Sequence, residues 1–282
     1  MSRIEGASIW RLLGLPLLVS LVVLVVLPAT GLLLTPILGG GVEEPISLSN
    51  GVGMWVALIG GGLLMIRASR LSWSGLGFIR QGWPRALATG ALLGAGLLTL
   101  VALVIWMLGG TRIEYAFTAS ALGPIAVAVF FFAAQGTWEE LVYRGYLMPH
   151  LSRLWGDKAS IIVTSLFFTA FHAANPGLTF MPILNLTVFG FVFALLYYRT
   201  GNMWLTGASH AVWNFSQGFI FGSEVSGNAA SASVLRSTGV PGRDLLSGGP
   251  FGFEGSIVTT IAGILIIAGL VFLWPKRTAA AA

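Results

Sequence analysis

Long apolar runs separated by short polar segments dominate the chain. A membrane-spanning helix needs roughly 20 mostly apolar residues, and eight runs approach that length. They cover about residues 10–34, 51–67, 84–108, 121–149, 158–174, 181–199, 202–222 and 255–274. The pattern predicts an all-α fold: a polytopic transmembrane bundle of about eight spanning helices that forms a single domain over residues 1–282.

Composition supports a membrane location and narrows the possible chemistry. Hydrophobic residues make up 56% and charged residues 9% of the 282 positions, whereas soluble domains contain about 25% charged residues. The chain therefore predicts an integral membrane protein in contact with the lipid bilayer. Its net charge of +5 does not indicate a nucleic-acid partner, because the positive charges lie beside apolar segments. The lack of cysteine excludes disulfides and thiolate chemistry.

Arginine and lysine placement predicts the orientation, because cytoplasmic loops carry an excess of positive residues. With a cytoplasmic N-terminus, twelve of the 15 positive residues fall on the cytoplasmic side. They are Arg3, Arg11, Arg67, Arg70, Arg80, Arg85, Arg144, Arg153, Lys158, Arg199, Lys276 and Arg277. Arg112, Arg236 and Arg243 fall outside. Both termini are therefore predicted to be cytoplasmic.

The segment 223–254 is rich in glycine and serine and is predicted to form an extracytoplasmic loop. Its end, 248–252, has the composition of tight turns. Two interpretations stay open: a plain surface loop, or a loop folded back over the mouth of the bundle. Glu254 is expected to lie outside the membrane in solvent.

Three ionisable side chains lie inside the fourth apolar run, where each costs roughly 2.5–3.5 kcal/mol at the membrane centre. Glu140 and Arg144 are four residues apart and share a helix face, so they are expected to form an ion pair. Glu139 points about 100° away from Glu140 and is free to face another helix. The alternative is that both glutamates are structural.

Further polar groups lie on two later helices: His172, four residues after Phe168, and His210, four residues before Asn214. Taken alone, His172 is typical of a histidine at the C-terminal end of a helix. Taken alone, His210 and Asn214 are typical of a hydrogen-bonded polar pair that joins helices. From the rise of about 1.5 Å per residue, Glu139 and both histidines are expected at overlapping depths. Such a group can activate a water molecule.

Two forms of that chemistry stay open. Glu139 could act directly as a general base, with Asn214 donating a hydrogen bond to a developing oxyanion. The alternative is a zinc ion bound by Glu139, His172 and His210, with a fourth position left for water.

The same residues carry a resemblance to a known family. The order and spacing of three motifs resemble those of the CAAX protease and bacteriocin-processing (CPBP, or Abi) family of intramembrane peptidases. These motifs are Glu139-Glu140-x-x-x-Arg144, Phe168-x-x-x-His172 and His210-x-x-x-Asn214. The similarity covers about residues 120–222, the expected catalytic helical core.

The resemblance implies an eight-helix bundle whose site lies inside the membrane and opens towards the cytoplasm. It implies that Glu139 and His172 activate the attacking water while His210 and Asn214 stabilise the oxyanion, with Glu140, Arg144 and Phe168 in support. The stretch 248–255 is also similar to bacterial members, so a prokaryotic inner (plasma) membrane is expected.

Three functions remain to be weighed. The favoured hypothesis is a peptidase that cleaves a membrane-associated peptide or protein. The second is a non-enzymatic immunity or scaffold protein that binds a partner through the same polar pocket. A proton-coupled transporter is the third, motivated by intramembrane glutamates, but no inverted repeat or pair of broken helices supports it.

Overall fold

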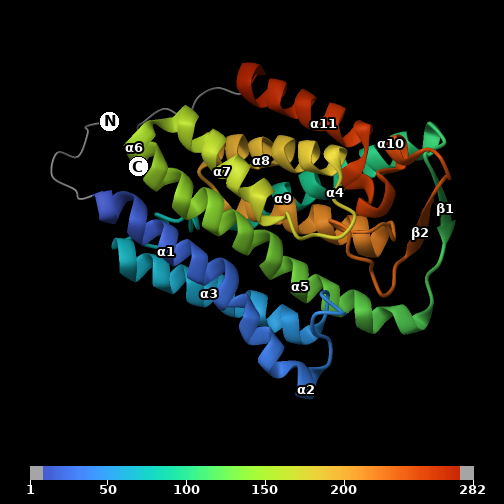
Figure 1. Cartoon of the computed structure of the whole chain (residues 1–282), viewed down its shortest axis with the longest axis horizontal. Coiled ribbons are helices and arrows are strands. Elements are labelled where there is room, and N and C mark those ends of the chain that lie inside the picture. The colour runs from blue at the N-terminus through green and yellow to red at the C-terminus, as the bar shows by residue number, and fades with distance from the viewer. Residues whose placement is uncertain (1–8, 274–282) are drawn as a thin grey trace.

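The computed structural model of the chain describes residues 9–273 and is almost entirely helical (Figure 1). The helices are α1 (Leu15–Leu21), α2 (Thr35–Leu38), α3 (Leu48–Ser69), α4 (Trp83–Met107), α5 (Leu122–Glu140), α6 (Met148–Trp155), α7 (Asp157–Phe171), α8 (Phe180–Thr200), α9 (Met203–Phe215), α10 (Asp244–Ser247) and α11 (Ile257–Ala268). Between α5 and α6 the chain continues through a π-helical segment, Leu141–Leu147. Predictions that concern Arg3, Lys276 and Arg277 fall outside the described residues.

Five helical stretches within residues 9–273 are long and apolar enough to cross a membrane. They are Trp10–Leu38, Leu48–Ser69, Trp83–Met107, Ala119–Trp155 and Phe180–Thr200. The other three predicted spans are helical but are not among these five. α7 has 15 residues, and Ile257–Leu273 is an apolar helix below the length of a full span. α9 continues through a π-helical segment, Ser216–Ile220, but contains several polar residues. The membrane bundle is therefore found, but the count of eight full spans is not.

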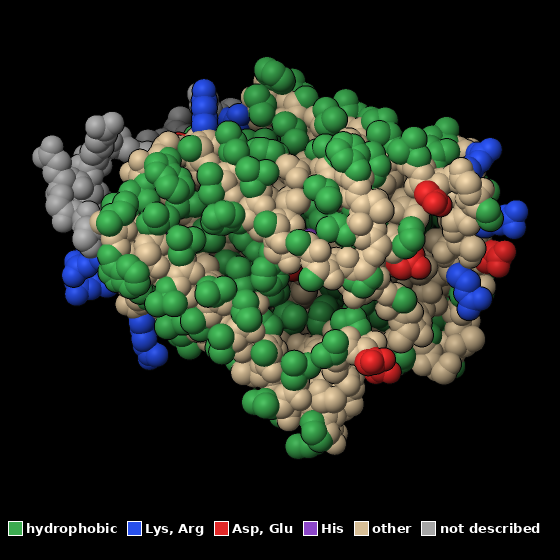
Figure 2. Space-filling view, viewed as in Figure 1, with side chains coloured by type: hydrophobic (Ala, Val, Ile, Leu, Met, Phe, Trp, Pro, Cys, Tyr) green, Lys and Arg blue, Asp and Glu red, His purple; other side chains and the backbone are tan. Residues whose placement is uncertain are grey.

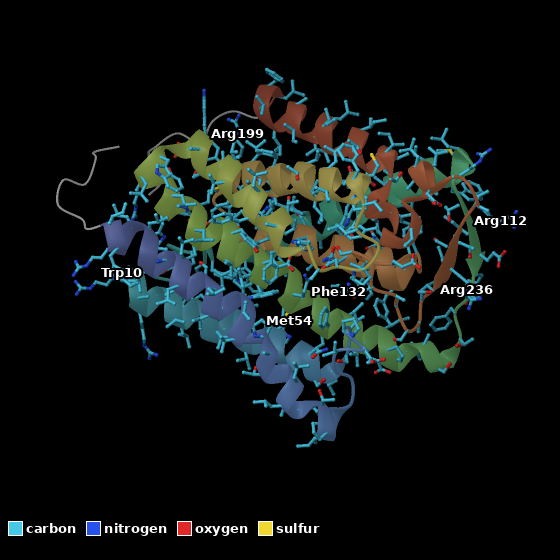
Figure 3. All side chains as sticks on the ribbon, viewed as in Figure 1. Trp10, Met54, Arg112, Phe132, Arg199 and Arg236 are labelled. Carbon is cyan, nitrogen blue, oxygen red and sulfur yellow. The ribbon has the colours of Figure 1, made fainter. Side chains whose placement is uncertain are left out.

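Charged side chains gather at the two ends of the long axis, with hydrophobic side chains between them (Figure 2). The turns after α3 and α8 and the short connection between α6 and α7 lie at one end. The opposite end holds strands β1 (Thr111–Tyr115) and β2 (Leu235–Gly239), which pair antiparallel. Figure 3 shows Trp10 near the first end and Arg112 and Arg236 at the second.

Helix α9 occupies the centre of the bundle because glycines let two neighbours approach it closely. A Cβ atom on Gly90 or Gly94 of α4 would overlap the backbone of α9 at Leu205 or Ser209. On the other side of α9, a Cβ on Gly136 of α5 would lie 2.5 Å from the Ala211 nitrogen. Small residues at such positions are the usual means of close packing between membrane helices. The three glycines thus let α9 pack closely against both α4 and α5.

Candidate functional site

The ion pair expected within the fourth apolar run is present and wholly buried. Arg144 and Glu140 each have 0% exposed side chain, and Arg144 Nη1 lies 3.0 Å from Glu140 Oε1. Arg144 Nη2 also donates to the Gly190 carbonyl oxygen at 2.9 Å, and its guanidinium carbon lies 4.7 Å from the centre of the Phe168 ring. The charge of Arg144 is therefore neutralised inside the helix bundle, away from lipid.

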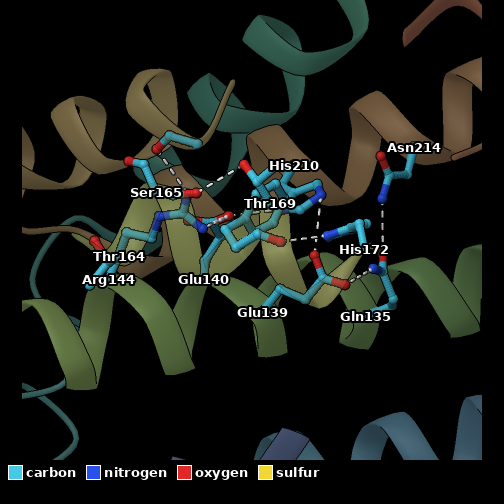
Figure 4. Close-up of polar contacts among 12 residues, drawn as sticks. Gln135, Glu139, Glu140, Arg144, Thr164, Ser165, Thr169, His172, His210 and Asn214 are labelled. Carbon is cyan, nitrogen blue, oxygen red and sulfur yellow. Dashed lines mark hydrogen bonds and ion pairs between the residues drawn. The ribbon is translucent and has the colours of Figure 1, made fainter. Parts of the chain in front are cut away.

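Glu140 also orients His210. The Nδ1 atom of His210 lies 2.9 Å from Glu140 Oε1, and because a carboxylate only accepts, Nδ1 carries the proton. The imidazole stacks on Phe193, with ring centres 4.7 Å apart and an interplanar angle of 16°. These contacts direct Nε2 towards Glu139, whose Oε2 lies 3.8 Å away (Figure 4). The two adjacent glutamates thus contact different atoms of one histidine.

His172 is the residue directly after α7, where the helix ends. Its Nδ1 atom lies 2.8 Å from the Phe168 carbonyl oxygen, so Nδ1–H donates and Nε2 is left as an acceptor. The Phe168 ring packs against the imidazole with ring centres 4.6 Å apart. Phe168 therefore supports two groups, because it also contacts Arg144.

A chain of amide groups joins Glu139 to Asn214. Gln135 Nε2 donates to Glu139 Oε1 at 2.6 Å, and Asn214 Nδ2 donates to Gln135 Oε1 at 3.0 Å. An ionised Glu139 requires a donor, so the carboxylate determines which way both amides face. Glu139 Oε2 and Asn214 Oδ1 are buried without a hydrogen-bond partner among the described residues. Both are available to a molecule in the cavity.

The motif analysis missed Gln135 because it carries no charge and belongs to none of the three motifs. A signal was present, because Gln135 lies four residues before Glu139 and shares its helix face.

The four side chains proposed from the sequence line one cavity of about 320 Å³. Glu139 comes from α5, His172 from the end of α7, and His210 and Asn214 from α9. Figure 2 shows a hollow near the middle of the drawn face, ringed by hydrophobic side chains. The structure thus brings together residues up to 75 positions apart in the sequence (139 to 214). The polar groups of the cavity thus lie among hydrophobic side chains.

The proposed zinc ligands do not form a metal-ligand group in this arrangement. Among residues 9–273, no three His, Cys, Asp or Glu side chains are placed to hold an ion. Glu139, His172 and His210 nevertheless share the cavity, and the contacts of both Nδ1 atoms with Phe168 and Glu140 leave only Nε2 of each ring to bind an ion.

The cavity extends towards the end of the bundle that holds β1 and β2. Besides the four polar groups, it is lined by Pro45, Asn175, Ser226 and Glu254, all from connections at that end. The arginine-based orientation makes this the extracytoplasmic end, whereas the resemblance implied a site that opens towards the cytoplasm. These two expectations cannot both hold.

The segment 223–254 folds back onto the bundle. Val225 and Phe251 are buried, and Asn175 Nδ2 donates to the Ser226 carbonyl oxygen at 3.1 Å. The interpretation as a plain surface loop is wrong. Glu254, which was expected in solvent, is half-buried: it lines the cavity and accepts hydrogen bonds from Trp213 and Ser226.

Comparison with known proteins gives one family match. Residues 121–216 match the family model described as Type II CAAX prenyl endopeptidase Rce1-like. The matched segment runs from α5 to α9 and includes Glu139, Glu140, Arg144, Phe168, His172, His210 and Asn214. A search of curated proteins gives no match. Over residues 121–216, the match confirms the resemblance to the CAAX protease family that was drawn from the three motifs.

Proposed function

We propose that the chain is an intramembrane endopeptidase that hydrolyses a peptide bond in a membrane-associated peptide or protein. The CAAX prenyl endopeptidase match supports this reaction class. The observation that carries the proposal is Glu139 Oε2, which is buried without a hydrogen-bond partner among the described residues, in a cavity shared with His172, His210 and Asn214. A free carboxylate oxygen in such a place is suited to accept a proton from water.

In the first step, a water molecule hydrogen-bonds to Glu139 Oε2 through one O–H and to His172 Nε2 through the other. Glu139 takes the first proton while the water oxygen bonds to the carbonyl carbon of the substrate. Gln135 holds Glu139 Oε1 at 2.6 Å, so the carboxylate keeps one orientation. Such proton transfer contributes about 10²–10⁴-fold to rate.

The tetrahedral intermediate carries a negative oxygen that needs hydrogen-bond donors. Asn214 has one N–H bonded to Gln135 and a second free to donate. Because Nδ1–H of His210 is bonded to Glu140 Oε1, Nε2 can donate to the negative oxygen of the intermediate only in the doubly protonated ring. As the C–N bond breaks, Glu139 returns its proton to the leaving amine, and the products are an amine and a carboxylic acid that still carries the second proton of the water. The acid then ionises to the carboxylate.

Cleavage by the reconstituted chain tests the proposal. We expect purified protein in liposomes to cut membrane-anchored quenched peptides, and Glu139→Gln to lower kcat by about 100-fold or more. Glu44→Gln, which removes an exposed glutamate outside the cavity, should cleave as the parent does. Undiminished cleavage by Glu139→Gln would instead favour a scaffold that uses the same pocket for binding.

The same assay addresses zinc. Because the described residues form no metal-ligand group, the proposed steps use the chain's own side chains, and prolonged treatment with a chelator should leave kcat unchanged. A loss that added zinc restores would instead support a metal held by Glu139, His172 and His210.

A further inference from the structure

A second carboxylate lines the cavity besides Glu139. Glu254 lies in a short 3₁₀ turn, Phe253–Gly255, of the folded-back segment. Its Oε1 accepts from the Trp213 indole N–H at 3.3 Å, and its Oε2 accepts from the backbone N–H and hydroxyl of Ser226 at 2.7 and 2.9 Å. All three donors are neutral. The Glu254 carboxylate is therefore stabilised by hydrogen bonds, but no positively charged group neutralises it.

No fixed positive charge faces this carboxylate within residues 9–273. The residues that line the cavity include no lysine or arginine, and Glu254 takes part in no ion pair. Arg144, the buried arginine nearest the site in sequence, is already paired with Glu140. The lining of the cavity thus includes two carboxylates, Glu139 and Glu254. Glu254 is half-buried, so part of its hydration is lost, and a bound cation relieves that cost.

Two other observations point to a ligand that brings donors. Glu139 and Asn214 are 4% exposed, and each has a buried acceptor oxygen with no partner in the described structure. Aromatic rings also line the cavity beside Glu254: Trp213 and Phe189, with ring centres 4.8 Å apart. Aromatic faces next to a carboxylate are favourable surroundings for an ammonium or guanidinium group.

We propose that Glu254 forms a subsite for a lysine or arginine side chain of the substrate. This inference rests on the proposed function, in that a peptide enters the cavity. Trp213 precedes Asn214 on α9, so the subsite adjoins the reacting groups and selects a basic residue close to the cleaved bond. An acidic residue at that position is disfavoured by both carboxylates.

Binding rather than cleavage provides the test. Three fluorescent apolar peptides differ only at one central residue, which is lysine, norleucine or glutamate. Their Kd values are measured on the full chain in detergent, with Glu139→Gln present throughout to stop turnover. We expect lysine to bind about tenfold more tightly than norleucine and glutamate to bind most weakly. If the norleucine peptide binds as tightly as the lysine peptide or more tightly, the proposal is overturned, and no Glu254 variant is needed to show it.

Variants assign the preference to Glu254. Glu254→Gln should reduce the lysine-to-norleucine ratio to about twofold or less, while Glu254→Asp, which keeps the charge, should preserve most of it. The matched control is Glu224→Gln, because Glu224 is on the same segment but does not line the cavity. A ratio that is unchanged in Glu254→Gln would contradict the proposal.

The subsite and the peptidase can fail separately. If Glu139→Gln binds the lysine peptide selectively but the parent chain cleaves none of the peptides, the subsite stands and the proposed function falls. If it cleaves all three with equal kcat/KM and binds them equally, the function stands and the subsite falls.

Discussion

Glu139 is fixed at one carboxylate oxygen and free at the other, and Gln135 provides the fixed contact. The hydrogen bond from Gln135 Nε2 to Glu139 Oε1 leaves Glu139 Oε2 without a hydrogen-bond partner and available to the cavity. The same amide accepts from Asn214, so one neutral side chain contacts both the proposed base on α5 and the proposed oxyanion donor on α9. We therefore propose that Gln135 is a positioning residue.

Replacing Gln135 should impair turnover more than binding. Gln135→Leu removes both hydrogen bonds, and a small displacement of a reacting group can cost about 100-fold; we expect kcat to fall by about 10- to 100-fold with KM little changed. Gln81→Leu, an exposed position outside the cavity, is the control. A loss confined to thermal stability, with normal kcat in the folded fraction, would contradict this role.

A variant of the same size separates positioning from packing. In Gln135→Glu, the protonated carboxyl can still donate to Glu139. Once that proton is lost, two carboxylates face each other. The kcat/KM of Gln135→Glu should therefore decline as pH rises, and the pH profile of the parent should lack this decline. A profile parallel to the parent's would show that Gln135 only fills space.

At the residue scale, sequence spacing predicted contacts along one helix better than contacts between distant segments. The four-residue separation of Glu140 and Arg144 was enough to predict their ion pair. Helix depth was enough to suggest that Glu139 and His210 meet. Glu254 was misplaced because its position depends on how a long irregular segment folds back, which no periodicity encodes.

At the scale of elements, the glycine contacts on both sides of α9 determine where His210 and Asn214 lie. The Gly90 and Gly94 spacing on α4 indicates helix packing from sequence alone, and the structure has that contact. Gly136 on α5 forms the corresponding contact three residues before Glu139. A change there should move α9 away from the glutamates.

Gly136→Ala tests this coupling. The added Cβ would lie 2.5 Å from the Ala211 nitrogen, so we expect a loss of about 1–3 kcal/mol in unfolding free energy and lower kcat. Thermal unfolding in detergent and peptide cleavage measure the two effects. Gly96→Ala, where no atom lies within 4 Å, is the control and should be neutral. Parent-like stability in Gly136→Ala would mean that α9 is not held there.

Two element-level features could not be predicted. Hydropathy does not determine where a helix ends, and α7 ends at Phe171 after 15 residues. α9 continues as a π-helix to Ile220, but its polar residues make it less apolar than the five long spans. Strands β1 and β2 pair although they are separated by more than 100 residues, from Tyr115 to Leu235. Neither has a local hairpin pattern that would indicate the partner.

For the whole molecule, the unequal charge of the two ends sets the orientation that we expect. Arg67, Arg70, Arg85, Arg153 and Arg199 belong to the end opposite the strands. By the positive-inside rule we expect that end to be cytoplasmic. The cavity then extends towards the extracytoplasmic side, away from the direction that the family resemblance implied.

Single cysteines can determine the orientation, because the chain has none of its own. Ser74→Cys at the arginine-rich end and Ser231→Cys near the strands are both exposed positions. In right-side-out vesicles, a membrane-impermeant maleimide should label Ser231→Cys at once and Ser74→Cys only after permeabilisation. The reverse pattern would place the cavity mouth towards the cytoplasm and show that arginine placement misleads here.

The central claim is that Glu139 activates water for peptide hydrolysis inside the bundle. Its most direct test is mass spectrometry of the cleavage products formed in heavy-oxygen water by the parent chain and by Glu139→Gln. We predict that the parent incorporates heavy oxygen into each newly formed carboxylate, and that Glu139→Gln forms almost no product. Labelled product formed at the parent's rate by Glu139→Gln would contradict the account.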